Sequence, residues 1–323
     1  MNSTRRQMLR AAGVVPLMAA GAARAQQFPN KPIKIIVPAS PGTSIDAVTR
    51  FFAEPLSRRF NTSVVVENRS GAGGLLAYQT VAKSPPDGYT LILTGTPLYL
   101  LPLFNEAAAS AFDPVKDFAP VARVARVPYA IVVGPESPHH TLGDLVQAMK
   151  AKPGELTYSS QGVGSSAHLC SVILSDMAKI KAQHVSYKET TVAVTDVAGG
   201  RVTFTCQTSV GALPLVKAGR LRALAVTSSK RWDELPDTPT ASESAIPGFE
   251  ASSQLDFMAP AQTPESILNL LSDEFVKIAQ TQAFADFCAK QVLARDVMAS
   301  APLRPEMVRE AARWKNIAHL ARS

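Results

Sequence analysis

The sequence predicts an α/β protein with two domains and largely parallel strands. Short apolar, β-branched runs alternate along the chain with segments whose apolar residues recur at helical spacing, and this alternation is typical of βα units. Several predicted strands end in turns rich in glycine and serine. The length of 323 residues favours two domains over one.

The N-terminal residues have the pattern of an export signal. A basic start at residues 5–10 precedes the apolar run 11–20, and residues 23–25 offer a small-x-small cleavage site, so we expect cleavage before Gln26. The apolar run is too short to span a bilayer. The two arginines within residues 4–9 also resemble a twin-arginine signal. Both the twin-arginine and the general secretory route therefore stay open.

Composition and charge exclude some classes of function. The formal net charge is +7, but four arginines lie in the predicted signal, which leaves about +3 for the mature chain and suits an anionic solute. No cluster of arginines interleaved with aromatic residues occurs, which argues against a nucleic-acid partner. Cys170, Cys206 and Cys288 lack metal-ligand spacing. Export would allow two of them to pair, but the sequence does not show which two, and at least one is expected to be a buried hydrophobe.

The first strand–turn–helix unit begins at Ile33. The β-branched run 33–37 is a predicted strand that ends at Pro38, residues 39–42 form a turn, and a helix follows. Thr43 and Asp46 have the spacing of a capping box. The free N–H groups at such a helix start attract anions. We therefore interpret this unit as half of a site for a small carboxylate.

A second such unit follows, then a third strand that ends in a polar loop, and then a second α/β series. In the first series we expect strands at 63–67 and 89–93, a glycine-rich turn at 68–74, a helix at 75–83 and a polar loop at 94–96. Parallel strands would bring these loops to one edge of the sheet. In the second series we expect a helix at 142–150 capped by Thr141, and a glycine- and serine-rich turn at 159–166 that opens another helix. The strands are expected at 156–158, 184–187, 202–207 and 221–226, and two further helices at 192–198 and 210–218.

Two stretches are predicted to cross between the domains. The first lies at 122–133, around Val127 and Pro128, and the return follows Thr227 in a proline-rich span. A strand at 257–259 and an amphipathic helix starting at Thr263-Pro264 then belong to the first domain, with one or two more helices at the end. The expected division is a signal at 1–25, domain 1 at 26–124 plus 228–323, and domain 2 at 125–227.

Three turns, at 39–46, 68–74 and 159–166, carry the candidate chemistry. Each follows a predicted strand and precedes a predicted helix, so their amides and hydroxyls can converge on an anion. The alternative is that tight βα turns simply require glycine and serine. Among these turns only Arg69 is basic, so capture would rest on dipoles and hydroxyls. The glycines at 71–74 match neither a dinucleotide fingerprint nor a Walker loop, and G-x-S-x-G and H-E-x-x-H are absent.

Two polar residues have more than one interpretation. His168 could donate to a ligand carboxylate or be a polar residue on a helix face. Asp46 could orient the first loop through hydrogen bonds or only stabilise a helix N-terminus. We expect Asp46 to do both, and neither role is catalytic.

The chain resembles the solute-binding receptors of tripartite tricarboxylate transporters, the Bug-type periplasmic proteins, over nearly all of its mature length. The matching segments are KPIKIIVPASPGTSIDAVTR (31–50), VVVENRSGAGG (64–74), AKSPPDGYTLIL (82–93), DPVKDFAPVARV (113–124), AKPGELTYSSQGVGSSAHL (151–169), HVSYKETTVAVTDVAGGRV (184–202), VKAGRLRALAVT (216–227), LPDTPT (235–240) and APAQTPESI (259–267). Their number, order and spacing make the resemblance specific.

The resemblance implies a type II periplasmic binding protein fold, with two α/β domains and a ligand cleft between them. It implies a monomer without cofactor, metal or catalysis, which delivers a carboxylated solute to integral membrane permease subunits. By position, the ligand-binding residues would be Ala39, Ser40, Thr43, Ser44, Asp46, Ser70, Ala72, Gly73, Thr96, Gly164, Ser165, Ser166, His168 and Gln207.

Three departures from the family pattern bear on the choice of ligand. The family usually has glycine at the position of Thr43, often an acid at Gln207, and glycine at Glu189. Loss of the acid argues against an amino-acid ligand, and Glu189 would repel a second carboxylate if it faced the cleft. Two other functions stay open, a sensor that passes its closed form to a signalling partner and an exported α/β enzyme that uses His168.

Overall fold

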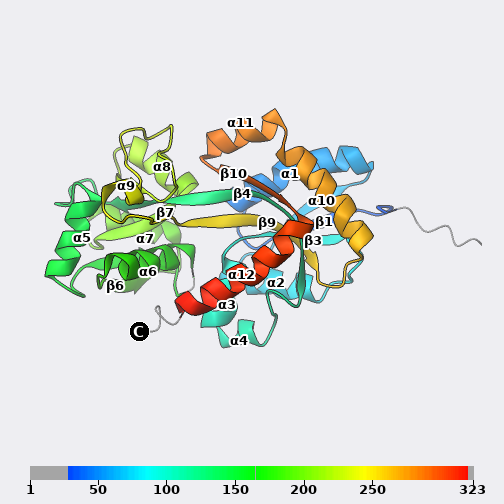
Figure 1. Ribbon diagram of the computed structural model, residues 1–323, viewed down its shortest axis with the longest axis horizontal. Helices are drawn as coiled ribbons and strands as arrows, with labels where there is room; N and C mark the ends of the chain where they lie inside the picture. Colours follow the sequence, from blue (N-terminus) through cyan, green and yellow to red (C-terminus); the bar gives the residue numbers. More distant parts are fainter. Residues whose placement is uncertain (1–27, 164, 319–323) are drawn as a thin grey trace, which may run out of the picture.

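The computed structural model describes residues 28–163 and 165–318, in which ten strands form one continuous sheet. The strand order is β2-β1-β3-β9-β4-β7-β5-β6, and β10 and β8 also pair with β4. β4 (Phe118–Val133) is shared by two lobes, which lie side by side in Figure 1. The predicted signal, its cleavage site before Gln26, and Gly164 lie outside the described residues.

The first lobe contains the two expected strand–turn–helix units, and its third strand is followed by a helix that was not predicted. Its strands, besides part of β4, are β1 (Ile33–Val37), β2 (Val64–Asn68), β3 (Thr90–Thr94), β9 (Ser252–Pro260) and β10 (Ala294–Ala299). Its helices are α1 (Ser44–Phe60), the 3₁₀ turn η1 (Ala72–Gly74), α2 (Leu75–Ala82), α3 (Pro97–Phe104), α4 (Glu106–Ala109), α10 (Glu265–Ala279), α11 (Gln282–Gln291) and α12 (Ser300–Ala318).

The second lobe contains the second α/β series. Its strands, besides the end of β4, are β5 (Thr157–Ser160), β6 (Gln183–Ser186), β7 (Phe204–Thr208) and β8 (Arg222–Val226). Its helices are α5 (Leu142–Ala151), α6 (Ser166–Ala178), α7 (Thr190–Ala198), α8 (Ser209–Lys217) and α9 (Ala241–Ser244). The predicted cap of α5 is confirmed, since Thr141 and Asp144 form a complete capping box. In the described part of the chain, no helix is long and apolar enough to cross a membrane.

The parallel strands place the predicted loops at the sheet edges as expected. β1 pairs in parallel with β2 and β3 in the first lobe, and β5 pairs in parallel with β6 and β7 in the second. The loops after β1, β2 and β3 therefore share one edge, and those after β5, β6 and β7 share another.

β4 is one strand of 16 residues that runs through Pro128, where the sequence indicated two apolar runs. It pairs with β9 as far as Pro128 and with β7 from Tyr129 onward. The Tyr129 N–H donates to Thr227 Oγ1 at 2.8 Å. The proline thus stands where β4 changes partners, so its missing N–H costs little.

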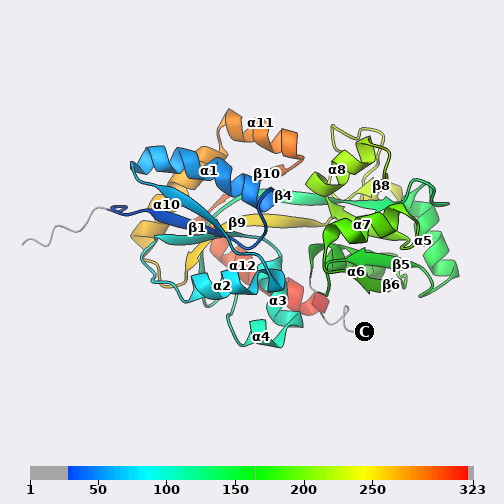
Figure 2. The ribbon, with the colours of Figure 1, turned by 180° about the vertical axis from the view of Figure 1, so that it is seen from behind.

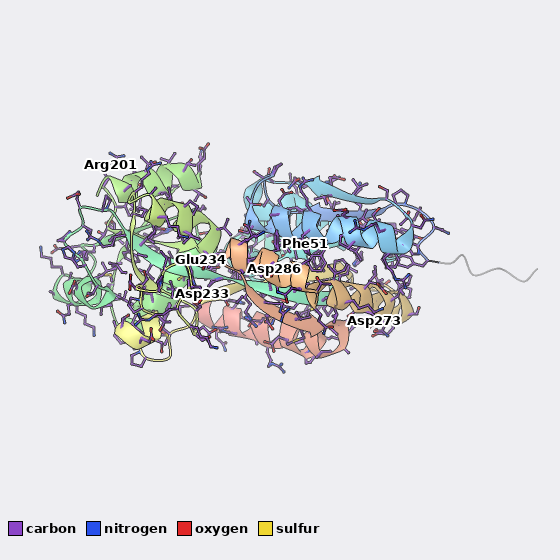
Figure 3. The ribbon with its side chains drawn as sticks, turned by 90° about the horizontal axis from the view of Figure 1, so that it is seen from above. Phe51, Arg201, Asp233, Glu234, Asp273 and Asp286 are labelled. Atoms are coloured by element: carbon purple, nitrogen blue, oxygen red, sulfur yellow. The ribbon has the colours of Figure 1, made fainter. Side chains whose placement is uncertain are left out.

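The helices divide between the two faces of the first-lobe sheet. α1, α10 and α11 cover one face, and α2, α3 and α12 the other (Figure 2). Phe51 of α1, labelled in Figure 3, meets Phe284 and Phe287 of α11 at ring-centroid distances of 5.2 and 4.8 Å. On the face of α12, one apolar core continues from Ile36 in the first lobe to Leu174 in the second.

Candidate functional site

The first predicted loop, at 39–46, corresponds to residues 38–43 between β1 and α1 and is held by Asp46 in the first turn of α1. Asp46 is 3% exposed. Its Oδ2 accepts the N–H of Gly42 at 2.9 Å, where φ is +82°, and Arg50 Nε donates to both carboxylate oxygens at 3.1 Å. Burial raises the pKa of Asp46, but hydrogen bonds from Arg50, Gly42 and Asn68 outweigh it and hold the pKa below its usual value. Asp46 therefore orients the loop as an anion.

The capping box predicted for Thr43 and Asp46 is wrong. Thr43 is the N-cap of α1, but its Oγ1 donates to the Ser40 carbonyl at 2.9 Å and caps no N–H. Asp46 accepts the N–H of Gly42 and not that of Thr43. The first N–H groups of α1, from Ser44, are thus left uncapped beside the exposed Ser40 and Thr43. This end of α1 is suited to an anion.

The second predicted loop is fastened directly to the first. Asn68 Nδ2 donates to the Ala39 carbonyl at 3.0 Å and to Asp46 Oδ1 at 2.9 Å. The Arg69 N–H donates to the Val37 carbonyl at 2.8 Å. The two loops therefore form one hydrogen-bonded unit at the edge of the first-lobe sheet.

The close approach of these loops depends on Gly74. Residues 71–74 all have positive φ, and Gly74 is buried with φ +95°. A Cβ there would lie 2.9 Å from Pro38 Cβ and 3.0 Å from the Tyr78 ring. The predicted site residues of this loop are exposed: Ser70, Ala72 and Gly73.

Gly74→Ala is expected to destabilise the protein more than Gly71→Ala. Both positions have positive φ, but a Cβ at Gly71 meets nothing within 4 Å, so the difference reports the clash of a Cβ at Gly74 with Pro38 and Tyr78. We expect about 1–3 kcal/mol of extra loss in the free energy of unfolding, measured by urea denaturation. Equal losses for the two variants would contradict the close approach.

The third predicted loop is held by its own hydroxyls. Ser160 Oγ accepts the Gly162 N–H and donates to the Gly162 carbonyl, both at 3.1 Å, and lies 2.7 Å from His184 Nε2. Ser165 is the N-cap of α6 and accepts the His168 N–H at 3.3 Å. Ser165 thus has a capping role that the sequence pattern did not reveal.

Thr96 and Ser166, predicted site residues from the two lobes, are linked through the crossing strands. Burial raises the pKa of Tyr129, although the neighbouring hydroxyls of Ser166 and Ser253 favour its ionised form. Ser253 Oγ accepts the Thr96 N–H at 3.1 Å. The sequence analysis missed Tyr129 and Ser253. The one available signal was the polar Ser-Ser-Gln run at 252–254 at the start of a largely apolar strand.

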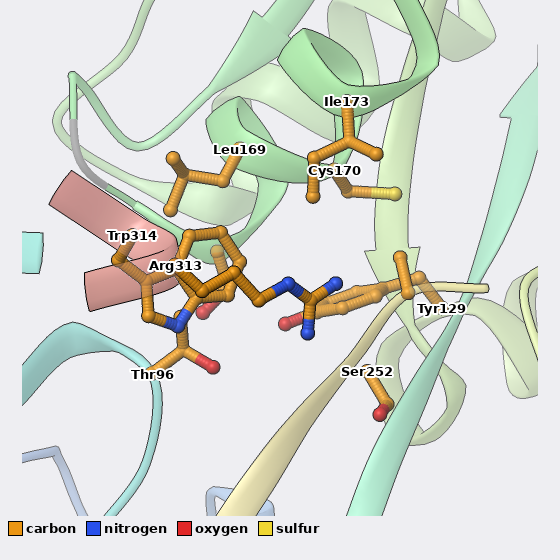
Figure 4. Close-up of a pocket in the computed structure, with 10 residues that line it drawn as sticks. Thr96, Tyr129, Leu169, Cys170, Ile173, Ser252, Arg313 and Trp314 are labelled. Carbon is orange, nitrogen blue, oxygen red and sulfur yellow. The ribbon is translucent and has the colours of Figure 1, made fainter. Parts of the chain in front are cut away.

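The end of α12 packs against this junction. Figure 4 shows Arg313 and Trp314 between Thr96 of the first lobe and Leu169 of α6 in the second. Trp314 is buried, and its Nε1 donates to Glu310 at 2.8 Å. The remaining cavity is about 10 Å³, which is close to the space of one water molecule. The C-terminal helix therefore closes the junction between the lobes.

Gln207, at the end of β7, is a buried donor. It is 4% exposed, and its Nε2 has no acceptor among the described residues. A Cβ at Gly211 would lie 3.1 Å from Gln207 Oε1, so this glycine makes room for the amide. The buried Ser159 and Ser209 hydroxyls also lack partners within the part described. Since an unpaired buried donor is costly, an oxygen atom of a ligand or a water is expected here.

His168 lies in an aromatic cluster beside the third loop. It is 2% exposed, and its ring centroid is 4.6 Å from that of His184 and 6.2 Å from that of Phe104. Burial, and then His184, lower the pKa of His168 to about 4. His168 is therefore neutral at neutral pH.

This shift makes folding sensitive to acid. A histidine whose pKa is lower in the folded than in the unfolded state makes its full contribution to stability above about pH 6.5. This contribution is lost progressively as the pH falls toward about 4. We expect His168→Gln to flatten the fall of Tm across this range, with a residual slope from His184, whose pKa burial also lowers. An unchanged slope would show that His168 does not titrate this way.

The fold and the paired loops define a class, the periplasmic binding proteins. The chain is similar to the solved periplasmic binding protein BugD, with a TM-score of 0.77 and 26% identity over 91% of this chain and 98% of that one. In the described residues, no group of three His, Cys, Asp or Glu side chains is placed to bind a metal ion.

The chain belongs to the tripartite tricarboxylate transporter receptor family, whose model matches residues 48–320. It is 32% identical to protein BugT of Bordetella pertussis over 91% of this chain and 90% of that protein. It is similar to Rpa4515 of R. palustris, solved with adipate, with a TM-score of 0.81 and 31% identity over 91% and 98% of the two chains. It is also similar to MatC of Rhodopseudomonas palustris, solved with malate, with a TM-score of 0.74 and 26% identity over 90% and 100%. The family consists of solute-binding receptors and not of enzymes.

Proposed function

We propose that this receptor captures a small carboxylate between its lobes and delivers it to the membrane subunits of a tripartite tricarboxylate-type transporter. The main support is the run of neighbouring polar side chains from Thr96 through Ser253 and Tyr129 to Ser166, which joins candidate residues of both lobes. Two relatives were solved with adipate and malate, both carboxylates.

One ligand carboxylate would lie against the first two loops. The uncapped start of α1 and the exposed hydroxyls of Ser40, Thr43 and Ser70 offer donors. Arg69 is engaged elsewhere, since it pairs with Glu67 and donates to Thr80 at 2.8 Å. Capture would therefore rest on backbone N–H groups and hydroxyls rather than on an arginine.

The far wall would come from the second lobe. Its candidates are the third loop with Gly164, Ser165, Ser166 and His168, and Gln207 at the end of β7. The unpaired Gln207 amide favours a ligand whose distal group accepts a hydrogen bond. Glu189 is exposed at the start of α7 and would repel a second carboxylate only if the closed form turned it inward.

The lobes would act as two domains. We propose residues 26–124 plus 228–323 for the first and 125–227 for the second, in a monomer that acts in the periplasm after cleavage before Gln26. β4 and β9 would carry the hinge, since β4 pairs with strands of both lobes and β9 lies beside it up to Pro128. Ligand would shift an existing equilibrium toward the closed form by its better contacts there.

Thermal melting against a panel of solutes tests this function. The carboxylates in the panel are adipate, malate and benzoate. Each of them that binds the folded protein alone is expected to raise Tm progressively with its concentration. Glucose and putrescine serve as a neutral and a cationic comparison. The proposal fails if only the comparison solutes raise Tm.

A further inference from the structure

Two of the three cysteines meet inside the second lobe. Cys170 of α6 and Cys206 of β7 are free thiols of the same buried core in this structure, where α6 packs on β7. The Ser171 hydroxyl also donates to Cys206 Sγ at 3.5 Å. Cys288 lies on α11 in a separate core of the first lobe. The fold thus selects one pair where the sequence left all pairings open.

We propose that Cys170 and Cys206 form a disulfide in the exported protein and that Cys288 stays a free thiol. The proposal depends on the contact between α6 and β7 and on the periplasmic class of the family. An oxidising compartment lets neighbouring thiols pair, whereas the cytosol keeps them reduced. It does not depend on the identity of the ligand.

The bond would form by two thiol–disulfide exchanges with a protein disulfide donor of the periplasm. One cysteine thiolate attacks the donor disulfide and gives a mixed disulfide, and the second thiolate displaces the donor, which leaves as a dithiol. The pair loses two electrons to the donor and releases two protons. Burial, and then the hydrogen bond with Cys206, raise the pKa of Cys170 well above its usual value. The exchange therefore belongs to folding, before α6 packs on β7.

The bond would join two elements of the proposed far wall. Cys170 lies four residues after Ser166 on α6, and Cys206 directly precedes Gln207 on β7. A covalent link between them would keep the third loop and the Gln207 amide in a fixed relation during closure. It would also restrict the unfolded chain between the two cysteines, which raises Tm.

Thiol counting tests the pair directly. The full chain is exported to the periplasm, purified without reductant, denatured in excess N-ethylmaleimide and weighed by mass spectrometry. We expect one label on the wild type, and three after reduction. Cys288→Ala should take no label before reduction and two after it, whereas Cys170→Ala should take two in both conditions.

Three labels on the unreduced wild type would overturn the proposal, and so would a disulfide that includes Cys288. Reduction of the folded wild type is also expected to lower Tm by roughly 4–10 °C. Cys170→Ala serves as the matched control, since its Tm should not respond to reductant. These readouts are independent of solute binding, so they can fail while the proposed function holds.

Discussion

Asp256→Ala is expected to lower the free energy of unfolding by about 3–5 kcal/mol, the largest loss of stability anticipated for a single side chain here. Asp256 of β9 and Arg123 of β4 are 1% and 0% exposed. Arg123 Nε donates to Oδ1 at 2.7 Å and Nη2 to Oδ2 at 3.0 Å. Burial lowers the pKa of Arg123, but Asp256 raises it above the usual value, so the guanidinium stays charged.

The cost arises because the variant leaves a buried charge without its partner. Asp296 lies 3.8 Å from Arg123 Nη1, which forms no hydrogen bond within the described residues, so Asp296 does not replace Asp256. Arg123 and Asp256 are opposite each other in the β4–β9 pairing, and their ion pair therefore holds the two crossing strands together.

Glu54→Ala is the matched control for this experiment. Glu54 also pairs with an arginine, Arg58 at 2.6 Å, but the two side chains are 75% and 69% exposed. Urea denaturation should show a loss of at most about 0.5 kcal/mol for this variant. A loss for Asp256→Ala no larger than that of the control would contradict the role of the buried pair.

Asp46→Ala is expected to weaken binding of the carboxylate about 10- to 100-fold. The carboxylate of Asp46 accepts hydrogen bonds from Gly42, Asn68 and Arg50, which belong to the first loop, the end of β2 and α1. Without it, the loop N–H groups would no longer be held toward one ligand position. Lost bonds of this charged kind are worth about 1.5–3 kcal/mol each, which is consistent with the expected change in Kd.

Asp144→Ala separates binding from stability. Asp144 occupies the same position in the first turn of α5 as Asp46 does in α1, and it completes a capping box with Thr141 in the second lobe. Both variants should lose about 1 kcal/mol or more of stability, but calorimetric titration should show a weaker Kd only for Asp46→Ala. Equal Kd values for both variants would remove Asp46 from the site.

The repeated βα units were predictable because each is a local pattern of an apolar run, a turn and a helix start. The crossing strand β4 was harder, because Pro128 suggests a break unless one knows that the strand changes partners there. β10 (Ala294–Ala299) was missed since it contains two charged residues, Arg295 and Asp296, none of its residues is buried, and its apolar residues do not alternate clearly. α3 was missed because its run is apolar on all sides.

The three loops of the candidate site were also predictable from their composition. Their connections were not. Tyr129 and Ser253 are 124 positions apart and meet only because β4 and β9 cross together. The engagement of Arg69 with Glu67 likewise depends on tertiary geometry, although it agrees with the expectation of capture without a central arginine.

The most direct test of the carboxylate site is a calorimetric titration with matched ligands. Adipate and adipamide have nearly the same shape, but only adipate carries carboxylates. The titration uses the mature protein at neutral pH and the carboxylate that raises Tm most, or adipate where several carboxylates raise it equally. This carboxylate is expected to bind at least about 100-fold more tightly than its amide. Equal affinity for the acid and its amide would contradict recognition of a carboxylate by the first two loops.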